Sequence, residues 1–476
     1  MRLPRVVTGP RRKWLTLAAV SFGLFMIMLD NTIVNVALPS IQEDLDADLS
    51  ELEWVVAGYA LTFAALMLIG GKVADAYGRR LIFIVGIVIF TLASLACGLA
   101  ESGETLIAAR VVQGAGAALM NPATLSIIAA TFPPAQRGTA IGIWAGVSAL
   151  ALAIGPLVGG LLTESLGWNW IFFVNVPVGV LGVIASLLLI DESKDTTHER
   201  LDIPGLAASG VGLFALTFGL IEANSYGWAS PEILGAFAVA AIALAGFVLL
   251  EKHQRAPMLP LGLFKNRTYT GANTVVFLVA LAMFGVFFFV SLYMQNILRY
   301  SAIETGAAFL PMTILIMLIA PVAGKTTDRV GSRVLMTVGM LCVAGQLLYF
   351  SRLSADATFW NLLPGLMVGG VGMALTMTPG AAAATRAVPV DKAGVGSAVL
   401  NAFRQVGGTM GIAVMGAIVA AAAGGERTVD AFMDGFHDAL LVAALIAFSG
   451  AIVAFVLVRP HELEEAEQAQ AHELAA

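Results

Sequence analysis

The sequence predicts an all-α polytopic membrane protein. Hydrophobic residues make up 58% of the 476 residues, charged residues make up 12%, and the mean hydropathy is +0.87. Apolar runs of about 20 residues, the length that crosses roughly 30 Å of hydrocarbon as a helix, recur along the chain. These runs are too long for barrel strands, so we expect membrane-spanning helices.

We expect fourteen transmembrane helices separated by polar loops. Their ranges are 14–37, 54–74, 81–100, 105–130, 139–162, 168–190, 203–223, 232–250, 271–294, 306–324, 334–351, 359–381, 395–422 and 437–457. Lys and Arg residues set the orientation, because cytoplasmic loops carry the excess of positive charge. With the N-terminus inside, only Arg299, Arg352 and Arg427 fall in outer loops, and Arg110 and Arg404 fall within spans. Both termini are therefore predicted to be cytoplasmic.

An internal repeat predicts how the helices are grouped. The segments GKVADAYGRR at 71–80 and GKTTDRVGSR at 324–333 agree at five of ten positions, and each follows the second helix of a six-helix block. The helices at 203–223 and 232–250 have no counterpart in this repeat. The organisation is therefore six, two and six, with an N-terminal six-helix bundle at 1–190, an inserted helix pair with cytoplasmic linkers at 191–267, and a C-terminal six-helix bundle with a short acidic tail at 268–476.

Composition and residue spacing exclude several function classes. A net charge of −6 and the acidic tail HELEEAEQAQAHELAA give no support for a nucleic-acid partner. Cys97 and Cys342 lack the spacing of disulfides or metal sites, so no metal or cofactor is expected. None of the five histidines lies at membrane depth, and no nucleophile with a neighbouring base is apparent. We therefore do not expect an enzyme.

Seven segments together resemble the major facilitator superfamily, and within it the fourteen-helix drug:proton antiporter family of multidrug efflux proteins. They are MLDNTIVNVALPSI at 28–41, WVVAGYALTFAA at 54–65, GGKVADAYGRR at 70–80, LIAARVVQGAGAA at 106–118, IGPLVGGLL with GWNWIFFVNVPVG at 154–179, SLYMQNILRYSAIETGAAFLP at 291–311 and RQVGGTMGIAVMG at 404–416. The resemblance implies a major facilitator fold in the cell inner (plasma) membrane and a role in antibiotic resistance. It also implies the proton gradient as energy source. Ala76 and Ala151 depart from the family pattern, where Arg and Gly are usual.

Two opposite charges lie within the predicted spans at similar depth. At about 1.5 Å per residue, Asp30 lies roughly 24 Å from the inner boundary, and Arg110 lies about 8 Å from the outer end of its helix. A pairing would compensate the burial of each charge. Two interpretations are open: Asp30 exchanges a proton under the influence of Arg110, or a permanent ion pair holds the two helices in register. The resemblance adds Glu222 as a second proton-coupling candidate, although an acid at the membrane interface needs no functional explanation.

Three further groups of site residues are predicted. The substrate cavity is expected to include Tyr59, Gln113, Asn121, Tyr293, Gln295 and Arg404. The cytoplasmic gate is expected to include Gly71, Asp75, Gly78, Arg79, Arg80, Asp328 and Arg333. The resemblance implies an antiporter helix motif, which favours export over uptake and includes Gly142, Gly155, Pro156, Gly159 and Gly160. In the gate, Asp75 can accept hydrogen bonds from an arginine or a helix N-terminus, and the resemblance implies a lock on the outward-open state. Small residues in the motif allow close helix packing, which by itself explains their presence.

The sequence as a whole predicts a proton-coupled secondary exporter of small lipophilic compounds, with cationic drugs favoured, that works by alternating access. Its expected partners are a small-molecule substrate, protons and the lipid bilayer, and we expect it to act as a monomer. The alternatives are a proton-coupled importer of a small solute and a membrane sensor or scaffold without transport activity.

Overall fold

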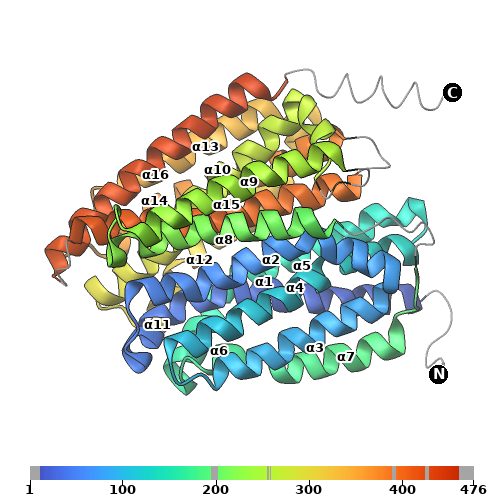
Figure 1. Cartoon of the computed structure of the whole chain (residues 1–476), viewed down its shortest axis with the longest axis horizontal. Coiled ribbons are helices and arrows are strands. Elements are labelled where there is room, and N and C mark those ends of the chain that lie inside the picture. The colour runs from blue at the N-terminus through green and yellow to red at the C-terminus, as the bar shows by residue number, and fades with distance from the viewer. Residues whose placement is uncertain are drawn as a thin grey trace. The chain divides into compact units, whose positions relative to one another are not determined.

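The fold is given by a computed structural model that describes residues 11–194, 202–254, 257, 259–388, 393–423 and 428–459. Helices are the only regular elements within these residues (Figure 1). The first nine are α1 (Arg12–Leu45), α2 (Leu49–Tyr77), α3 (Arg79–Gly98), α4 (Gly103–Thr131), α5 (Pro134–Leu166), α6 (Trp170–Phe173), α7 (Asn175–Leu189), α8 (Ile203–Tyr226) and α9 (Pro231–His253). They are followed by η1 (Leu261–Lys265), α10 (Arg267–Leu292), η2 (Tyr293–Ile297), α11 (Ala302–Ala308), α12 (Leu310–Val330), α13 (Ser332–Phe350), α14 (Phe359–Arg386), α15 (Ala393–Ala423) and α16 (Val429–Leu457).

The helices agree with most of the predicted spans. In the described part of the chain, 13 helices are long and apolar enough to cross a membrane. The remaining predicted span, 139–162, falls in α5, where Ile154–Leu166 is a shorter apolar helix. Several α5 side chains lie outside the described residues. The all-helical membrane fold is therefore confirmed, while the count of fourteen and the side on which the termini lie stay predictions.

The chain divides into two compact units. Unit 1 comprises Met1–Phe214, Ile242–Met258 and Tyr300–Ala307, and unit 2 comprises Ala215–Ala241, Leu259–Arg299 and Ala308–Ala476. Helices α1 to α7 belong to unit 1, and α10 and α12 to α16 belong to unit 2. The residues of the predicted inserted pair, α8 and α9, belong partly to unit 1 and partly to unit 2, and the grouping into six, two and six helices stays a prediction.

The internal repeat seen in the sequence extends to helix packing. In unit 1, α1 packs on α5, α2 and α3 pack on α4, and α3 packs on α7. In unit 2, the corresponding helices make the same pairs: α10 packs on α15, α12 and α13 pack on α14, and α13 packs on α16. Five matching positions in a ten-residue segment therefore indicate a duplication of a whole six-helix bundle.

The repeated segment adopts the same turn in both units. The second helix of the bundle ends at Gly78 in unit 1 and at Gly331 in unit 2, and the φ angles of these glycines are 127° and 79°. A positive φ is readily adopted by glycine and is costly for residues with a Cβ. These two glycines therefore separate consecutive membrane helices with a turn of a single residue.

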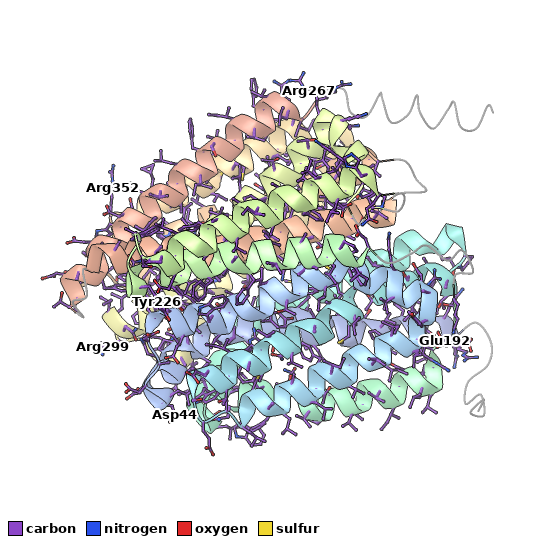
Figure 2. The ribbon with its side chains drawn as sticks, in the orientation of Figure 1. Asp44, Glu192, Tyr226, Arg267, Arg299 and Arg352 are labelled. Carbon is purple, nitrogen blue, oxygen red and sulfur yellow. The ribbon has the colours of Figure 1, made fainter. Side chains whose placement is uncertain are left out.

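The loops alternate between the two ends of each bundle, as expected for helices that cross a membrane. In Figure 2, Asp44 and Glu192 lie at opposite ends of unit 1, and Arg267 and Arg352 lie at opposite ends of unit 2. At the Asp44 end, Asp48 caps α2 and Ser102 caps α4, each in a reciprocal capping box. Side chains therefore satisfy some of the helix N–H groups that have no partner within the helix.

Candidate functional site

A buried ion pair lies in the middle of unit 1. Asp30 is on α1 and Arg110 is on α4, and the Nη1 atom of Arg110 donates to Asp30 Oδ2 at 2.5 Å. Both residues are 1% exposed. The depths calculated from the sequence placed these charges at the same level, and the structure shows that they meet. Each charge is therefore compensated in an environment where a lone charge is costly.

Gln113 completes a closed ring of hydrogen bonds with this pair. It lies on α4 one turn after Arg110, so both side chains project toward α1. Its Oε1 accepts from Arg110 Nη1 at 2.6 Å, and its Nε2 donates to Asp30 Oδ1 at 2.8 Å. Both carboxylate oxygens of Asp30 consequently have a donor, one charged and one neutral.

The ring continues into a wider polar network that connects four helices. Gln113 Nε2 also donates to Ser94 Oγ on α3 at 2.8 Å, and Asn175 Nδ2 on α7 donates to the same hydroxyl oxygen at 3.3 Å. Ser94 and Gln113 are fully buried and Asn175 is 3% exposed. Buried polar networks of this kind are stable only when their members find partners, so they fix the relative rotation of the helices that carry them.

Arg110 has acceptors and ring contacts in addition to the carboxylate. Its Nε donates to the backbone carbonyl of Val55 on α2 at 3.0 Å. Its guanidinium carbon lies 4.2 Å from the centroid of the Tyr59 ring and 5.7 Å from that of Phe172. Cations are attracted to aromatic faces within about 6 Å. Arg110 is therefore held by two neutral acceptors and two rings as well as by Asp30.

A glycine allows α2 and α4 to approach at this level. A Cβ on Gly114, the residue after Gln113, would collide with the backbone carbonyl of Tyr59. Close approach of the helix backbones brings the Tyr59 ring and the Val55 carbonyl within reach of Arg110, because both are on the adjoining turns of α2. Small residues serve this purpose generally in membrane helices.

The other predicted cavity residues are distributed over both units. In unit 1, Tyr59 and Gln113 belong to the buried network, and Asn121 is buried on α4, where its carbonyl accepts from Thr124 Oγ1. In unit 2, Tyr293 is fully buried and donates to the Ser354 carbonyl at 2.6 Å, while Gln295 donates to Ser291 Oγ at 3.3 Å. Within unit 1, the structure therefore brings two of these residues to Asp30, and the cavity as a whole stays a prediction.

Two predicted charged candidates belong to unit 2. Glu222 is partly buried near the end of α8, where Asn224 donates to the Ala417 carbonyl of α15 at 2.8 Å. Arg404 is partly buried on α15, and its Nε is enclosed without a hydrogen-bond acceptor among the described residues. Arg404 in unit 2 thus differs from Arg110 in unit 1, because Arg110 has a carboxylate beside it.

The predicted cytoplasmic gate forms a charged cluster in unit 1. Arg79 Nε donates to Asp75 Oδ1 at 2.7 Å, which is one of the two interactions expected for Asp75. Arg80 instead donates through Nη1 to the Ile190 carbonyl at 3.2 Å. Glu192, which follows α7, accepts from the backbone N–H groups of Arg80 and Leu81 at 3.1 Å each. Glu192 therefore caps the start of α3, as expected for a carboxylate at a helix N-terminus.

The second copy of the gate segment is built differently. The Arg333 guanidinium carbon lies 4.1 Å from the centroid of the Phe455 ring on α16, and its Nε has no hydrogen-bond acceptor among the described residues. The side chain of Asp328 lies outside the described residues. Gly71 is adjacent to Pro122 of α4. The implied lock on an outward-open state stays a prediction.

The antiporter helix motif packs closely, as its small residues predict. A Cβ on Gly155 would collide with the Thr32 side chain of α1, and one on Gly159 would lie 2.7 Å from the Ile33 carbonyl. On another side of α5, a Cβ on Gly160 would collide with the Ala302 carbonyl of α11. Reciprocally, a Cβ on Gly306 would collide with the Pro156 carbonyl. Gly142 lies outside the residues whose surroundings are described.

Three residues of these clusters were not predicted from the sequence. Ser94 and Asn175 are polar residues within apolar runs, and a polar residue in a membrane span indicates a buried polar partner, so the sequence did contain a signal for them. Glu192 lies in a polar linker among other charges and gave no such signal. Its role as a helix cap depends on a tertiary contact with a segment about 110 residues earlier in the chain.

Comparisons with known proteins define the class of this protein. The family model described as the Major Facilitator Superfamily matches residues 20–412. Among solved structures, a bacterial homologue of the human lysosomal transporter Spinster, inward-facing and unoccupied, has a TM-score of 0.66 at 17% identity and covers 97% of this chain and 99% of its own. An auto-inhibited POT family peptide transporter has a TM-score of 0.70 at 14% identity and covers 94% of this chain and 97% of its own. The chain belongs to the major facilitator superfamily, and it is a multi-pass cell-membrane transporter rather than an enzyme.

Its sequence relatives are resistance and export proteins. The tetracenomycin C resistance and export protein of Streptomyces glaucescens is 36% identical over 90% of this chain and 79% of its own length. The puromycin resistance protein of Streptomyces alboniger is 36% identical over 94% and 92% of the two chains. The multidrug resistance protein Stp of Mycobacterium tuberculosis is 38% identical over 86% of this chain and 76% of its own length. The resemblance inferred from the motifs is thereby confirmed.

Proposed function

We propose that this protein is a proton-coupled antiporter that exports small lipophilic compounds across the cell membrane by alternating access. The relatives named as resistance and export proteins support the direction of transport. The buried network of Asp30, Arg110 and Gln113 supports the coupling to protons, because it contains an acid, a fixed cation and an amide in direct contact.

The network suits two protonation states of Asp30. When Asp30 is ionised, it pairs with Arg110, which stays protonated at all relevant pH values. When a proton binds to Asp30, the attraction between the two side chains weakens, and Arg110 still has the Gln113 and Val55 oxygens as acceptors. These acceptors keep Arg110 hydrogen-bonded in both states, so the site can pass between them without leaving the guanidinium unsatisfied.

Protonation of Asp30 is connected to helix movement through the same contacts. Gln113 links Asp30 to Ser94 on α3, and Arg110 links it to Val55 on α2. A change in the charge of Asp30 therefore alters hydrogen bonds that fix the positions of α1, α2, α3 and α4. The proton enters from water on one side and leaves to water on the other, so that the cycle balances.

The preference for cationic cargo stays a prediction. It was based on two acids within the membrane and on the family resemblance, and Arg110 already neutralises Asp30 in this structure. A cationic compound that used Asp30 would have to compete with Arg110 for the carboxylate. Coupling is therefore better supported than the charge of the cargo.

Proteoliposomes test this proposal. The purified protein is reconstituted with a pH-sensitive dye inside, and ethidium is added as a fluorescent lipophilic probe. We expect ethidium-dependent proton flux from the wild type, none from Asp30→Asn, and normal flux from Glu104→Gln, which changes an exposed acid at the start of α4. Unchanged flux in Asp30→Asn would refute the proton-binding role of Asp30, and proton and ethidium moving in the same direction would indicate an importer. An absence of any flux in the wild type would favour the sensor or scaffold alternative.

A further inference from the structure

A single turn of α15 in unit 2 presents two polar donors without partners. Arg404 Nε and Gln405 Nε2 are enclosed by the protein, and neither has a hydrogen-bond acceptor among the described residues. Gln405 is 2% exposed. In the described part of the chain, no carboxylate forms an ion pair with Arg404. Unsatisfied buried donors are destabilising, and an uncompensated charge in a membrane span is more so.

Arg404 lies inside the apolar span of α15, which runs from Val395 to Ala422. It is about nine residues, or roughly 14 Å, from the nearer end of this span. Charged residues at such positions are costly and generally pair with another group or face a cavity. An acidic partner beside Arg404 would therefore lower the cost of its charge.

Aromatic residues contact the neighbours of Arg404 on α15. One turn after Arg404, a Cβ on Gly408 would lie 2.8 Å from Phe284 Cδ1, so the Phe284 ring lies directly on α15. Phe403 contacts Phe277 of α10, with ring centroids 6.4 Å apart. Arg404, Phe277 and Phe284 are all partly exposed. This partly exposed face of unit 2 therefore combines one cation with aromatic surface.

The two unsatisfied groups on this turn call for an acceptor, and the charge of Arg404 favours a negative one. Both unsatisfied groups on this turn are N–H donors. The unsatisfied acceptor on α10, Asn273 Oδ1, is an amide oxygen and carries no charge that could compensate a guanidinium. Guanidinium groups bind carboxylates with charge-assisted hydrogen bonds, which are the strong ones. The aromatic residues would in addition bind a planar, apolar body.

We propose that Arg404, with Gln405 and the Phe284 ring, forms a binding site in unit 2 for exported compounds that carry an acidic group on an aromatic framework. This proposal names a substrate class and rests on the export function proposed above. It assigns the acidic group to Arg404 and the ring to Phe284. Asp30 and Arg110 of unit 1 take no part in it.

The proposal is tested by equilibrium binding of two matched probes. Purified protein in phosphatidylcholine nanodiscs is titrated with 1-naphthoate, an aromatic carboxylate, and with 1-naphthamide, its uncharged counterpart. Empty nanodiscs correct for partition into lipid. We expect the wild type to bind 1-naphthoate at least about tenfold more tightly, the effect of one charge-assisted hydrogen bond. Equal affinities for the two probes in the wild type would overturn the proposal without recourse to any variant.

Variants then assign the preference to individual side chains. In Arg404→Gln the affinities for the two probes should become equal, Arg404→Lys should retain part of the preference, and Phe284→Leu should weaken both probes alike. Arg352→Gln, which changes an exposed loop arginine of unit 2, should behave as the wild type. A preference that persists in Arg404→Gln would overturn the proposal. Size-exclusion profiles show whether each variant is folded.

Anionic lipid is the competing source of negative charge. The titration is repeated in nanodiscs that contain phosphatidylglycerol. If 1-naphthoate binding to the wild type falls there to the level of Arg404→Gln, a lipid phosphate fills the site, and the assignment to exported compounds is overturned. Equilibrium binding requires no gradient. Failure of the naphthoate preference with normal ethidium-dependent proton flux therefore contradicts this site alone. A normal naphthoate preference without that flux contradicts the proposed transport function and leaves the binding site in place.

Discussion

Replacing Arg110 should destabilise the protein more than replacing Asp30 does. In Arg110→Gln, the Asp30 carboxylate keeps only the Gln113 Nε2 donor. In Asp30→Asn, Arg110 keeps the Gln113 and Val55 oxygens as well as the Tyr59 ring. Leaving one charge of a buried pair uncompensated costs about 3–5 kcal/mol. We therefore expect the full cost in Arg110→Gln and a clearly smaller one in Asp30→Asn.

Thermal unfolding in detergent measures this difference. A loss of 1 kcal/mol lowers Tm by about 2–4 °C in a domain of this size, so Arg110→Gln should lose about 6–20 °C. The double variant should lose less than the sum of the two single losses, because residues in direct contact are coupled. A Tm within about 2 °C of the wild type for Arg110→Gln, or strictly additive losses, would refute the energetic role given to this pair.

Two further predictions concern packing and helix capping in unit 1. Gly155→Val should prevent close packing of α5 on α1, and it should abolish transport and much of the folded yield. Gly146→Ala, on the same helix with open space around it, should leave transport and folded yield unchanged. Normal folding of Gly155→Val would contradict the close approach of the two helices. Glu192→Ala should remove the cap from α3 and lower Tm by about 2–4 °C, since a cap contributes about 1 kcal/mol. Glu192→Gln should restore most of this because an acceptor oxygen remains, and equal losses in both variants would show that charge, rather than capping, is responsible.

The sequence predicts the membrane helices and the duplication well, because both depend on local signals. Apolar length defines a span, and a repeated segment with a glycine at its turn indicates two related bundles. The contact between Asp30 and Arg110 could also be predicted, because the rise per residue of a helix converts sequence position into depth in the membrane. Depth does not give rotation about the helix axis. For that reason Gln113, which was expected to line a cavity, could not be assigned to the Asp30 ring before the structure was known.

Other features depend on contacts that no local pattern contains. Tyr293 lies at the start of a π-helical turn, Tyr293–Ile297, and is fully buried in unit 2. Such a turn shifts the helical phase, and the apolar pattern gives no sign of it. The division of α8 and α9 between the units is likewise a tertiary property. The sequence shows only that this pair lacks a counterpart in the repeat.

The duplicated bundles have consequences for how this protein evolves. The two units share their helix pairs, but Asp30 with its ring of partners is in unit 1, and Arg404, whose Nε has no acceptor among the described residues, is in unit 2. If the two copies divide energy coupling and recognition as proposed above, one copy can vary while the other is held constant. Under selection by a new toxic compound, we therefore expect substitutions that change the spectrum of resistance to accumulate around Arg404 and Phe284, and those around Asp30 to be eliminated.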